Sequence, residues 1–223
     1  MKYILLLLCF LTFQQEKPKK WDWDKDKSKW SPLMMAVYDD DLNEVKKLID
    51  EGADLTYIAQ NKISLNALMI AILKNDKEMV EVLVDTQAFK RVLSYFSLAC
   101  MGENPMLIDY FISIGAQVNQ VSENGHSVLM SATRYASPSV VKRLIECGAN
   151  INLQREVDGR TPLMFAVSSG RLDNVEILLK NGADNSLRDW NNESALDQVD
   201  YIHYNLQLSE EEKEEIRALI KRY

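Results

Sequence analysis

The chain has 223 residues, of which 47% are hydrophobic and 26% are charged, and its formal net charge is -7. This composition excludes a disordered or collagen-like chain, and the length is sufficient for one domain with a sizeable core. An acidic chain repels phosphate backbones, and its basic stretch, residues 17–29, is short. We therefore expect no nucleic acid among its partners.

The N-terminal residues 1–15 are predicted to be a signal peptide. Lys2 precedes an apolar run, residues 3–13, that is too short to span a bilayer comfortably. No small residues mark a cleavage site before Glu16, so an uncleaved hydrophobic anchor is the alternative. Cys9 lacks the small preceding residue that a lipid-anchored cysteine requires. We expect an exported protein, periplasmic or secreted, that is membrane-tethered if this segment is not cleaved.

Residues 16–30 are predicted to be a charged tether that contains three tryptophans. Within it, residues 22–26 place aspartate at every second position, as at the start of a calcium loop. The Gly that such a loop needs at its sixth position is Lys27, and the Glu that it needs at its twelfth is Leu33. We therefore predict no metal site here. Trp30 directly precedes the rest of the chain and is predicted to pack over its exposed end.

Residues 31–223 contain an internal repeat, which is the main evidence for the fold. Its copies start at residues 31, 66, 94, 127, 161 and 194, and a Gly-Ala pair follows four of these starts at an offset of 21 residues. In the first five copies, an apolar triplet with the spacing i, i+3, i+4 lies between the start and this offset. Such a triplet is typical of one face of an amphipathic helix.

Each copy is predicted to form two short antiparallel helices. A Ser or Thr at the start accepts hydrogen bonds from the free N–H groups of the first turn. Pro105 and Pro138 are placed to begin second helices, where a missing N–H costs nothing. The glycine of the Gly-Ala pair ends the second helix, because a left-handed cap favours glycine. Such a unit has no core of its own and must stack on its neighbours.

This pattern resembles the ankyrin repeat, whose period is near 33 and whose signature is T-P-L-H-x-A followed by G-A-D. One copy reads Thr161-Pro-Leu-Met-Phe-Ala166 and is followed by Gly182-Ala-Asp184. The resemblance covers residues 31 to about 199. It implies an all-α ankyrin-repeat solenoid of paired antiparallel helices with β-hairpin or finger loops, built from five full repeats and a C-terminal capping repeat.

The sequence departs from the family pattern at two kinds of position. Methionine stands in place of the family's histidine at Met34, Met69, Met130 and Met164, so we expect apolar packing where the family has a polar link. Gln87 replaces the capping glycine, and the link that follows is short. This predicts a stunted hairpin between the second and third repeats.

The end of the chain is predicted to be a capping helix. The last copy breaks off after Val199, and Ser209-Glu-Glu-Glu212 is a capping box. Ile216, Leu219 and Ile220 then restore the apolar stripe, and charged residues surround them. A terminal repeat needs such a polar outer face.

No set of catalytic residues is recognised, and we predict neither an enzyme nor a cofactor or metal site. His126 and His203 lie in different repeats and have no cysteine or carboxylate pattern nearby. Ser139 begins an S-x-x-K match, but the S-D-N and K-T-G partners are missing, so a helix start is the better interpretation. Cys100 and Cys147 fall more than one repeat apart, which favours buried thiols over a disulfide.

The resemblance also implies a binding surface. Ankyrin repeats usually contact partners through loop tips just before each repeat start and through residues seven and eight places after it. In this chain those positions include Trp30, Tyr38, Leu73, Met101, His126, Arg134, Tyr135, Arg160, Ser168, Trp190 and Tyr201. Tyr, Trp, Arg and Met are enriched at interface hot spots, whereas the alternative is that several are ordinary surface or packing residues.

We therefore expect a protein-binding module that is monomeric alone and has another protein as its partner. Exported bacterial ankyrin-repeat proteins of this size resemble accessory or immunity factors for secreted enzymes. This implies a module that binds, masks or inhibits one partner through its concave face. A scaffold or a host-directed effector is the alternative. An enzyme is disfavoured, because no catalytic domain lies outside the repeats.

Overall fold

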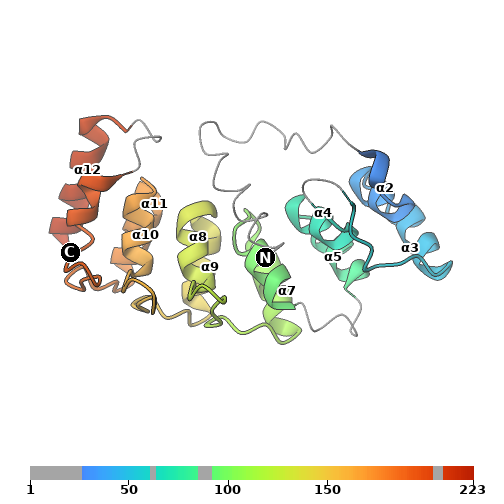
Figure 1. Ribbon diagram of the computed structural model, residues 1–223, viewed down its shortest axis with the longest axis horizontal. Coiled ribbons are helices and arrows are strands. Elements are labelled where there is room, and N and C mark those ends of the chain that lie inside the picture. The colour runs from blue at the N-terminus through green and yellow to red at the C-terminus, as the bar shows by residue number, and fades with distance from the viewer. Residues whose placement is uncertain (1–26, 61–63, 85–91, 203–207) are drawn as a thin grey trace. The chain divides into compact units, whose positions relative to one another are not determined.

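The computed structural model describes residues 27–60, 64–84, 92–202 and 208–223. Within these ranges the chain forms helices and no strands, apart from isolated backbone bridges. The contacts of the chain divide it into two units, residues 1–90 (unit 1) and residues 91–223 (unit 2). Both units contain helices arranged in pairs (Figure 1).

The described residues of unit 1 form two helix pairs. These are α2 (Pro32–Tyr38) with α3 (Leu42–Asp50), and α4 (Ala67–Leu73) with α5 (Lys77–Leu83). Each helix packs against the other member of its pair, and the first helices α2 and α4 also pack against each other. Met34, Val37 and Ile70 are buried on these first helices. The stacking that the repeat pattern requires is therefore present in unit 1.

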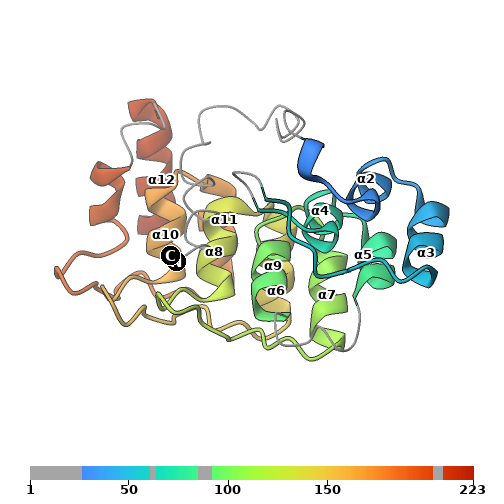
Figure 2. The same cartoon turned by 45° about the vertical axis from the view of Figure 1, so that its right-hand side comes forward.

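The described residues of unit 2 form three further helix pairs. These are α6 (Val92–Ala99) with α7 (Pro105–Ser113), α8 (Val128–Tyr135) with α9 (Pro138–Glu146), and α10 (Pro162–Ser168) with α11 (Leu172–Lys180). The first helices α6, α8 and α10 pack in that order, and so do the second helices α7, α9 and α11. Figures 1 and 2 show these two rows of helices. Phe96, Phe111 and Phe165 are among the largest fully buried side chains of the unit.

The helices begin where the sequence predicts. The side chains of Ser31, Ser127 and Thr161 accept hydrogen bonds from the backbone N–H three residues later, at 3.3, 3.1 and 3.3 Å. The second helices α7 and α9 begin at Pro105 and Pro138. The capping residues of the repeat pattern therefore mark these helix starts correctly.

The four methionines that replace the family's histidine are all buried. This confirms the predicted apolar packing, but two of them also make a polar contact. The Met130 sulfur accepts a hydrogen bond from the Ser127 N–H at 3.4 Å, and the Met164 sulfur accepts one from the Thr161 N–H at 3.5 Å. A thioether is a weak acceptor. In these two repeats, a weak hydrogen bond to sulfur therefore remains at the helix start in addition to the apolar packing.

The second helices of unit 2 end at glycines with left-handed backbone. Gly148 and Gly182 have φ angles of +87° and +90°, which residues with a Cβ rarely adopt. The Gly148 N–H donates to the Ile145 carbonyl at 2.9 Å, and the Ala149 N–H donates to the Leu144 carbonyl at 3.0 Å. These bonds satisfy the last carbonyls of α9, as the predicted cap requires.

Loops that we call fingers follow each second helix of unit 2. They span residues 114–127, 147–161 and 181–194. A backbone hydrogen bond closes each one near its end: Ser122 N–H to the His126 carbonyl, Arg155 N–H to the Arg160 carbonyl, and Asp189 N–H to the Glu193 carbonyl. Two isolated bridges, Val121 with Ser127 and Arg188 with Ser194, complete the pairing in the first and third fingers. The expected β-hairpins are therefore irregular loops with minimal pairing.

Asparagine side chains tie neighbouring fingers together. Asn119 donates from Nδ2 to the Gly148 carbonyl at 3.0 Å and accepts from the Asn150 N–H at 2.7 Å. Asn152 repeats the first contact one repeat later, with the Gly182 carbonyl at 3.3 Å. Each of these bonds joins one finger to the next, so together they fix the spacing between neighbouring fingers.

The C-terminal helix α12 (Glu210–Arg222) packs against α11 and against η3, a short 3-10 helix (Asp197–Tyr201). Ser209 and Glu212 form the predicted capping box. Ile216 and Ile220 are buried. The predicted capping helix is thus confirmed.

At the first repeat, Trp30 is 9% exposed and its ring lies edge-on to Tyr38, with 5.5 Å between the ring centres. The Lys27 ammonium lies 3.5 Å from the centre of the Tyr38 ring, as in a cation–π contact. The predicted packing of Trp30 at the start of the repeats is confirmed.

The predicted signal peptide, residues 1–15, the aspartate run 22–26 and the predicted turn at Gln87 lie outside the described residues. In the described part of the chain, no helix is both long enough and apolar enough to cross a membrane. Cys100 and Cys147 are free, and burial is the main cause that raises the pKa of each thiol.

Candidate functional site

One buried aromatic ring of unit 2 has basic side chains on several sides. Phe165 in α10 is buried, and three guanidinium carbons lie near the centre of its ring: Arg160 at 4.6 Å, Arg155 at 5.3 Å and Arg134 at 5.7 Å. The ring centre of His126 lies 5.2 Å from the same point. A cation over an aromatic face is attracted by the ring quadrupole. We call these five residues the Phe165 cluster.

Two adjacent repeats supply the cluster. Arg134 lies in the last turn of α8, which packs against α10 and so brings this side chain to Phe165. His126 lies near the end of the 114–127 finger, and Arg155 and Arg160 belong to the 147–161 finger. The backbone bond from the Arg155 N–H to the Arg160 carbonyl, at 3.0 Å, holds these two residues opposite each other across the finger.

Arg155 connects the two fingers. Its Nε donates to Asp158 Oδ1 at 2.8 Å, and its Nη2 forms an ion pair with Asp158 Oδ2. Its Nη1 lies 3.0 Å from Nε2 and 3.3 Å from Nδ1 of His126. Burial raises the pKa of the Asp158 carboxyl, but hydrogen bonds from Arg155 and the Arg160 N–H outweigh burial and lower the pKa below its ordinary value. Asp158 is therefore ionised and neutralises Arg155.

Arg160 is held by neutral acceptors. Its Nη2 donates to the Ser168 hydroxyl at 2.7 Å and to the Met164 carbonyl at 3.2 Å. Its Nε is buried and has no hydrogen-bond acceptor. Burial is the main cause that lowers the pKa of its guanidinium, while Asp158 raises that pKa and the charges of Arg134 and Arg155 lower it further. The Arg160 charge is thus only partly compensated.

Arg134 has less compensation still. Its guanidinium carbon lies 5.2 Å from the centre of the Tyr135 ring, and its buried Nε has no acceptor. Among the residues that the structure describes, no carboxylate forms an ion pair with Arg134 or Arg160. Asp189 is the other carboxylate that affects Arg160, and the Asn191 and Glu193 N–H groups already donate to it. The cluster therefore carries an excess of positive charge on a chain whose net charge is -7.

His126 is neutral in this environment. Burial, followed by the charges of Arg155 and Arg134, lowers the pKa of its imidazole to about 4. A neutral ring nitrogen can accept a hydrogen bond from Arg155, whereas an imidazolium cannot. The histidine therefore acts as a contact residue in the cluster.

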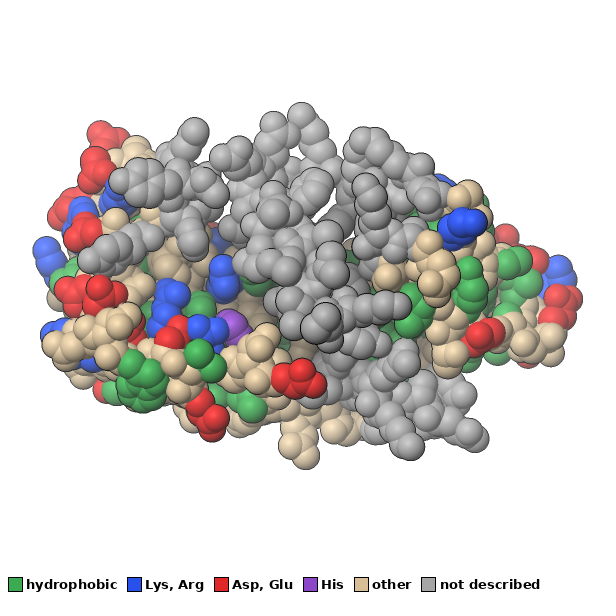
Figure 3. Space-filling view, in the orientation of Figure 1, with side chains coloured by type: hydrophobic (Ala, Val, Ile, Leu, Met, Phe, Trp, Pro, Cys, Tyr) green, Lys and Arg blue, Asp and Glu red, His purple; other side chains and the backbone are tan. Residues whose placement is uncertain are grey.

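Exposed apolar side chains lie on successive fingers beside the cluster. Val121, Val157 and Trp190 are 48%, 69% and 61% exposed. Figure 3 shows hydrophobic (green) side chains on the same face as basic (blue) and histidine (purple) side chains. We use the name finger face for these three residues together with the Phe165 cluster and Tyr135, whose ring lies beside Arg134. Large exposed apolar groups next to half-buried arginines are typical of a protein-binding surface.

Trp190 lies across the neighbouring finger. Its Nε1 donates to the Glu156 carbonyl at 3.1 Å, and its backbone N–H donates to the Asp158 carbonyl at 2.9 Å. Gly159, with a φ of +75°, allows this approach, because a Cβ there would lie 2.6 Å from the indole ring. One face of the indole is thus fixed on the protein while most of the side chain stays exposed. Trp190 therefore packs on the neighbouring finger and not beneath its own loop.

The structure brings together six of the eleven residues proposed for the site: His126, Arg134, Tyr135, Arg160, Ser168 and Trp190. Ser168 is buried beneath Arg160 and positions it, so we no longer propose it as a contact residue. Met101 is half-buried at the end of α6. The side chain of Tyr201 lies outside the described residues.

Trp30, Tyr38 and Leu73 belong to unit 1. Trp30 is buried against Tyr38, so its proposed role in partner binding is corrected to packing. Tyr38 and Leu73 are half-buried, and the Lys74 ammonium donates to the Tyr38 carbonyl at 2.5 Å. These positions stay a prediction from the resemblance.

Sequence reasoning missed Phe165 and Arg155. Phe165 occupies the fifth position of its repeat motif, where the other full copies have Met35, Ile70, Leu98 and Ser131. An aromatic at this position in one copy was the available signal. Arg155 lies six residues before its repeat start, outside the positions that ankyrin repeats usually use, and its contact with His126 is visible only in three dimensions.

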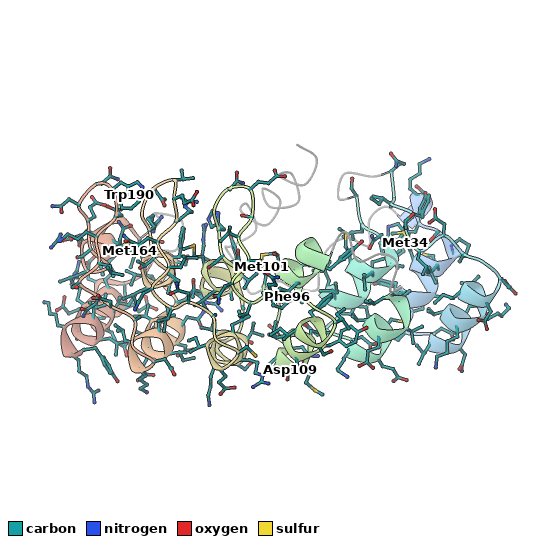
Figure 4. The ribbon with its side chains drawn as sticks, turned by 90° about the horizontal axis from the view of Figure 1, so that it is seen from below. Met34, Phe96, Met101, Asp109, Met164 and Trp190 are labelled. Atoms are coloured by element: carbon teal, nitrogen blue, oxygen red, sulfur yellow. The ribbon has the colours of Figure 1, made fainter. Side chains whose placement is uncertain are left out.

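Ion pairs lie on the second helices of unit 2. Arg143 in α9 forms ion pairs with Asp109 at 2.6 Å and Glu146 at 3.1 Å. Figure 4 places Asp109 among these helices and Trp190 on the finger side of unit 2. Within the described part of the chain, no three His, Cys, Asp or Glu residues are grouped as a metal site would require. The helix side of unit 2 therefore carries paired charges, whereas the finger side carries arginines that have no carboxylate partner among the described residues.

Stacked helix pairs joined by fingers define a helical repeat protein with an open binding surface. A family model described as "Ankyrin repeats (3 copies)" matches residues 5–92 and 96–189. The chain belongs to the ankyrin-repeat family, whose repeats are a protein-binding module.

Several curated proteins are similar to parts of the chain. A fowlpox virus protein described as an ankyrin repeat protein is 26% identical over 67% of this chain and 47% of its own length. A human 2-5A-dependent ribonuclease is 46% identical over 30% of this chain, and a Schizosaccharomyces pombe glycerophosphocholine phosphodiesterase is 31% identical over 47% of it. The match spans 9% of each of these two enzymes. The chain therefore spans less than half the length of each of these relatives.

Proposed function

We propose that the protein binds another protein through the finger face of unit 2. One observation carries this proposal: exposed Trp190 and Val157 lie near arginines that have no carboxylate partners in the described part of the chain. Trp and Arg are the residue types that most often dominate binding energy, particularly where packing holds the side chain in place. Trp190 is held in this way by its bonds to the neighbouring finger.

Site-specific photocrosslinking in the native host tests the proposal. A photoreactive amino acid at Val157 should form an adduct with one partner protein, because this side chain is 69% exposed on the finger face. Lys142 in α9 is the matched control, since its side chain is 67% exposed on the other side of the repeats. A partner crosslinked at Lys142 but not at Val157 would contradict the finger-face assignment.

We further propose that the protein is exported, periplasmic or secreted, and that it masks or inhibits its partner as an immunity or accessory factor. Residues 1–15 and the ankyrin resemblance support this role. A scaffold and a host-directed effector are the alternatives. The ribonuclease and phosphodiesterase names describe those relatives, and the repeats of this chain, which extend from residue 31, favour binding over catalysis.

Export can be tested separately from binding. Leu7→Arg places a charge in the apolar run of residues 3–13, which a signal peptide does not tolerate. We expect the wild-type chain outside the cytoplasm and the variant inside it by cell fractionation. The mass of the wild-type chain also reports whether residues 1–15 are removed. Identical cytoplasmic fractions would remove the export proposal and leave the binding proposal intact.

A further inference from the structure

The Phe165 cluster holds more positive charge than the described residues neutralise. Asp158 pairs with Arg155, whereas Arg134 and Arg160 have no carboxylate at ion-pair distance among the residues described. Like charges held close together repel, and here the Arg134 charge lowers the pKa of Arg160. A protein of net charge -7 has many carboxylates that could have relieved this repulsion. The unpaired state of these two arginines therefore requires an explanation.

We propose that Arg134 and Arg160 receive a carboxylate from an acidic segment of the partner protein. This inference rests on the proposed binding function and specifies the chemistry of the partner. Both guanidinium groups lie against the same aromatic ring, at 5.7 and 4.6 Å from its centre. The Ser168 hydroxyl and the Met164 carbonyl hold the Arg160 guanidinium there, and the planar fork of a guanidinium suits the two oxygens of a carboxylate.

Both side chains keep donors for a ligand. Arg160 uses Nη2 for Ser168 and Met164, while Arg134 donates no hydrogen bond to a described residue. Both residues are half-buried, so part of each side chain faces solvent. A carboxylate bound in a partly dry site interacts more strongly than one on an open surface.

The surroundings favour an acidic peptide over a nucleic acid. The net charge of -7 repels a polyanion, while a segment with one or two acidic residues meets only the local excess of positive charge. Trp190 and Val157 beside the cluster offer apolar contact to a neighbouring side chain of the same segment. We therefore commit to a peptide with Asp or Glu next to an apolar residue.

Selection from a random dodecapeptide library on the immobilised full-length chain tests this inference. We expect the enriched peptides to share an Asp or Glu beside an apolar residue. Replacing that acid with its amide should weaken binding about tenfold, the usual loss when a charged hydrogen-bonding partner is removed. Arg134→Gln should cause a similar loss, while Arg143→Gln, which makes the same charge change at an ion pair on α9, should not.

Arg134→Gln is the principal variant because Arg134 makes no hydrogen bond to a described residue that folding would need. Arg160→Gln is a second variant, and thermal unfolding shows whether it folds. An independent readout is the His126 imidazole: a bound carboxylate should raise its pKa from about 4, since Arg134 and Arg155 help to lower it. Because the chain has two histidines, the imidazole signal that is lost in the His126→Gln variant is the one that belongs to His126.

Several results would overturn the inference. Enriched peptides that share no Asp or Glu, or that bind the Arg134→Gln chain normally, would show that the arginines do not bind a carboxylate. If Trp190→Ala still weakens those peptides, the proposed finger-face function survives while this inference fails. If inorganic phosphate raises the pKa of His126 as much as the peptide does at equal concentration, the site takes phosphate and our choice of ligand is wrong. A His126 pKa that shifts in the unliganded Asp22→Asn, Asp24→Asn, Asp26→Asn variant would show that the chain's own carboxylates occupy the site, and it would overturn the inference of a carboxylate from a partner.

Discussion

Arg155 and His126, which lie 29 residues apart in the sequence, are in direct contact across two fingers. The Arg155 Nη1 lies 3.0 Å from Nε2 of the imidazole, and the other side of the same guanidinium pairs with Asp158. The contact requires a neutral imidazole, because both groups would otherwise be cations. The contact between these two fingers is therefore sensitive to pH.

Lowering the pH from 7 to 5 should destabilise the protein through His126. The folded-state pKa is about 4 and the ordinary value is 6.5, so the unfolded chain binds the proton first. This contribution to stability is complete above pH 6.5 and is lost as the pH falls toward 4. After allowance for solvent screening we expect a loss of about 1 kcal/mol.

Thermal unfolding at pH 7 and pH 5 measures this effect. His126→Gln should flatten the difference between the two melting temperatures, since glutamine does not titrate. The lowered pKa values of Asp158 and Asp197 act at lower pH and do not contribute in this window. An equal drop in the wild-type chain and the variant would assign the pH effect to other groups.

Deleting residues 209–223 should expose the apolar side of the last repeat. Ile216 and Ile220 are each 2% exposed, and the helix that carries them packs against α11 and η3. Since solenoid stability is roughly a sum of interfaces between neighbours, we expect a loss of several kcal/mol, on the order of 3, together with self-association. Light scattering and thermal unfolding measure both. A monomeric truncated chain with an unchanged melting temperature would contradict the capping role.

Met130→Leu should cost about 1 kcal/mol, because leucine fills the same volume but leaves the Ser127 N–H without its sulfur acceptor. Met34→Leu is the matched control, since Met34 is equally buried and its sulfur accepts no hydrogen bond from a described residue. Denaturant unfolding of the two variants gives the difference. Equal losses would show that the sulfur contact is energetically irrelevant.

Gly159→Ala should displace Trp190 from the 147–161 finger. The new Cβ would lie 2.6 Å from the indole, and the φ of +75° adds backbone strain of about 1 kcal/mol. Gly148→Ala carries similar strain at φ +87° but meets no atom within 4 Å. Tryptophan fluorescence should therefore change in the Gly159 variant alone. A spectral change of the same size in both variants would mean that strain, and not the indole contact, is responsible.

The sequence predicts the helices well because their signals are local. Ser127 and Thr161 cap helices, Pro138 starts one and Gly148 ends one, and each does so through contacts within a few residues along the chain. The core methionines follow from the same register.

The site was less predictable because it is built from distant residues. Arg155 and Phe165 are joined to His126 only by the stacking of two repeats. Trp30 is of a residue type that is common at interfaces, but its burial against Tyr38 depends on how the chain enters the first helix. The residue types indicated a binding surface, but which of these side chains are exposed on it depends on how the repeats pack.

The most direct test of the account is titration calorimetry of three folded variants against the partner identified by crosslinking. Arg134→Ala and Tyr135→Ala should each weaken binding by about 2 kcal/mol, roughly thirtyfold, because interface arginines and aromatics commonly cost this much when truncated. Lys142→Ala, on the exposed side of α9, should leave binding within about 0.5 kcal/mol of the wild-type value. Loss of binding in the Lys142 variant, together with normal binding by the other two, would show that the partner uses the helix side and that the finger face is not the working surface.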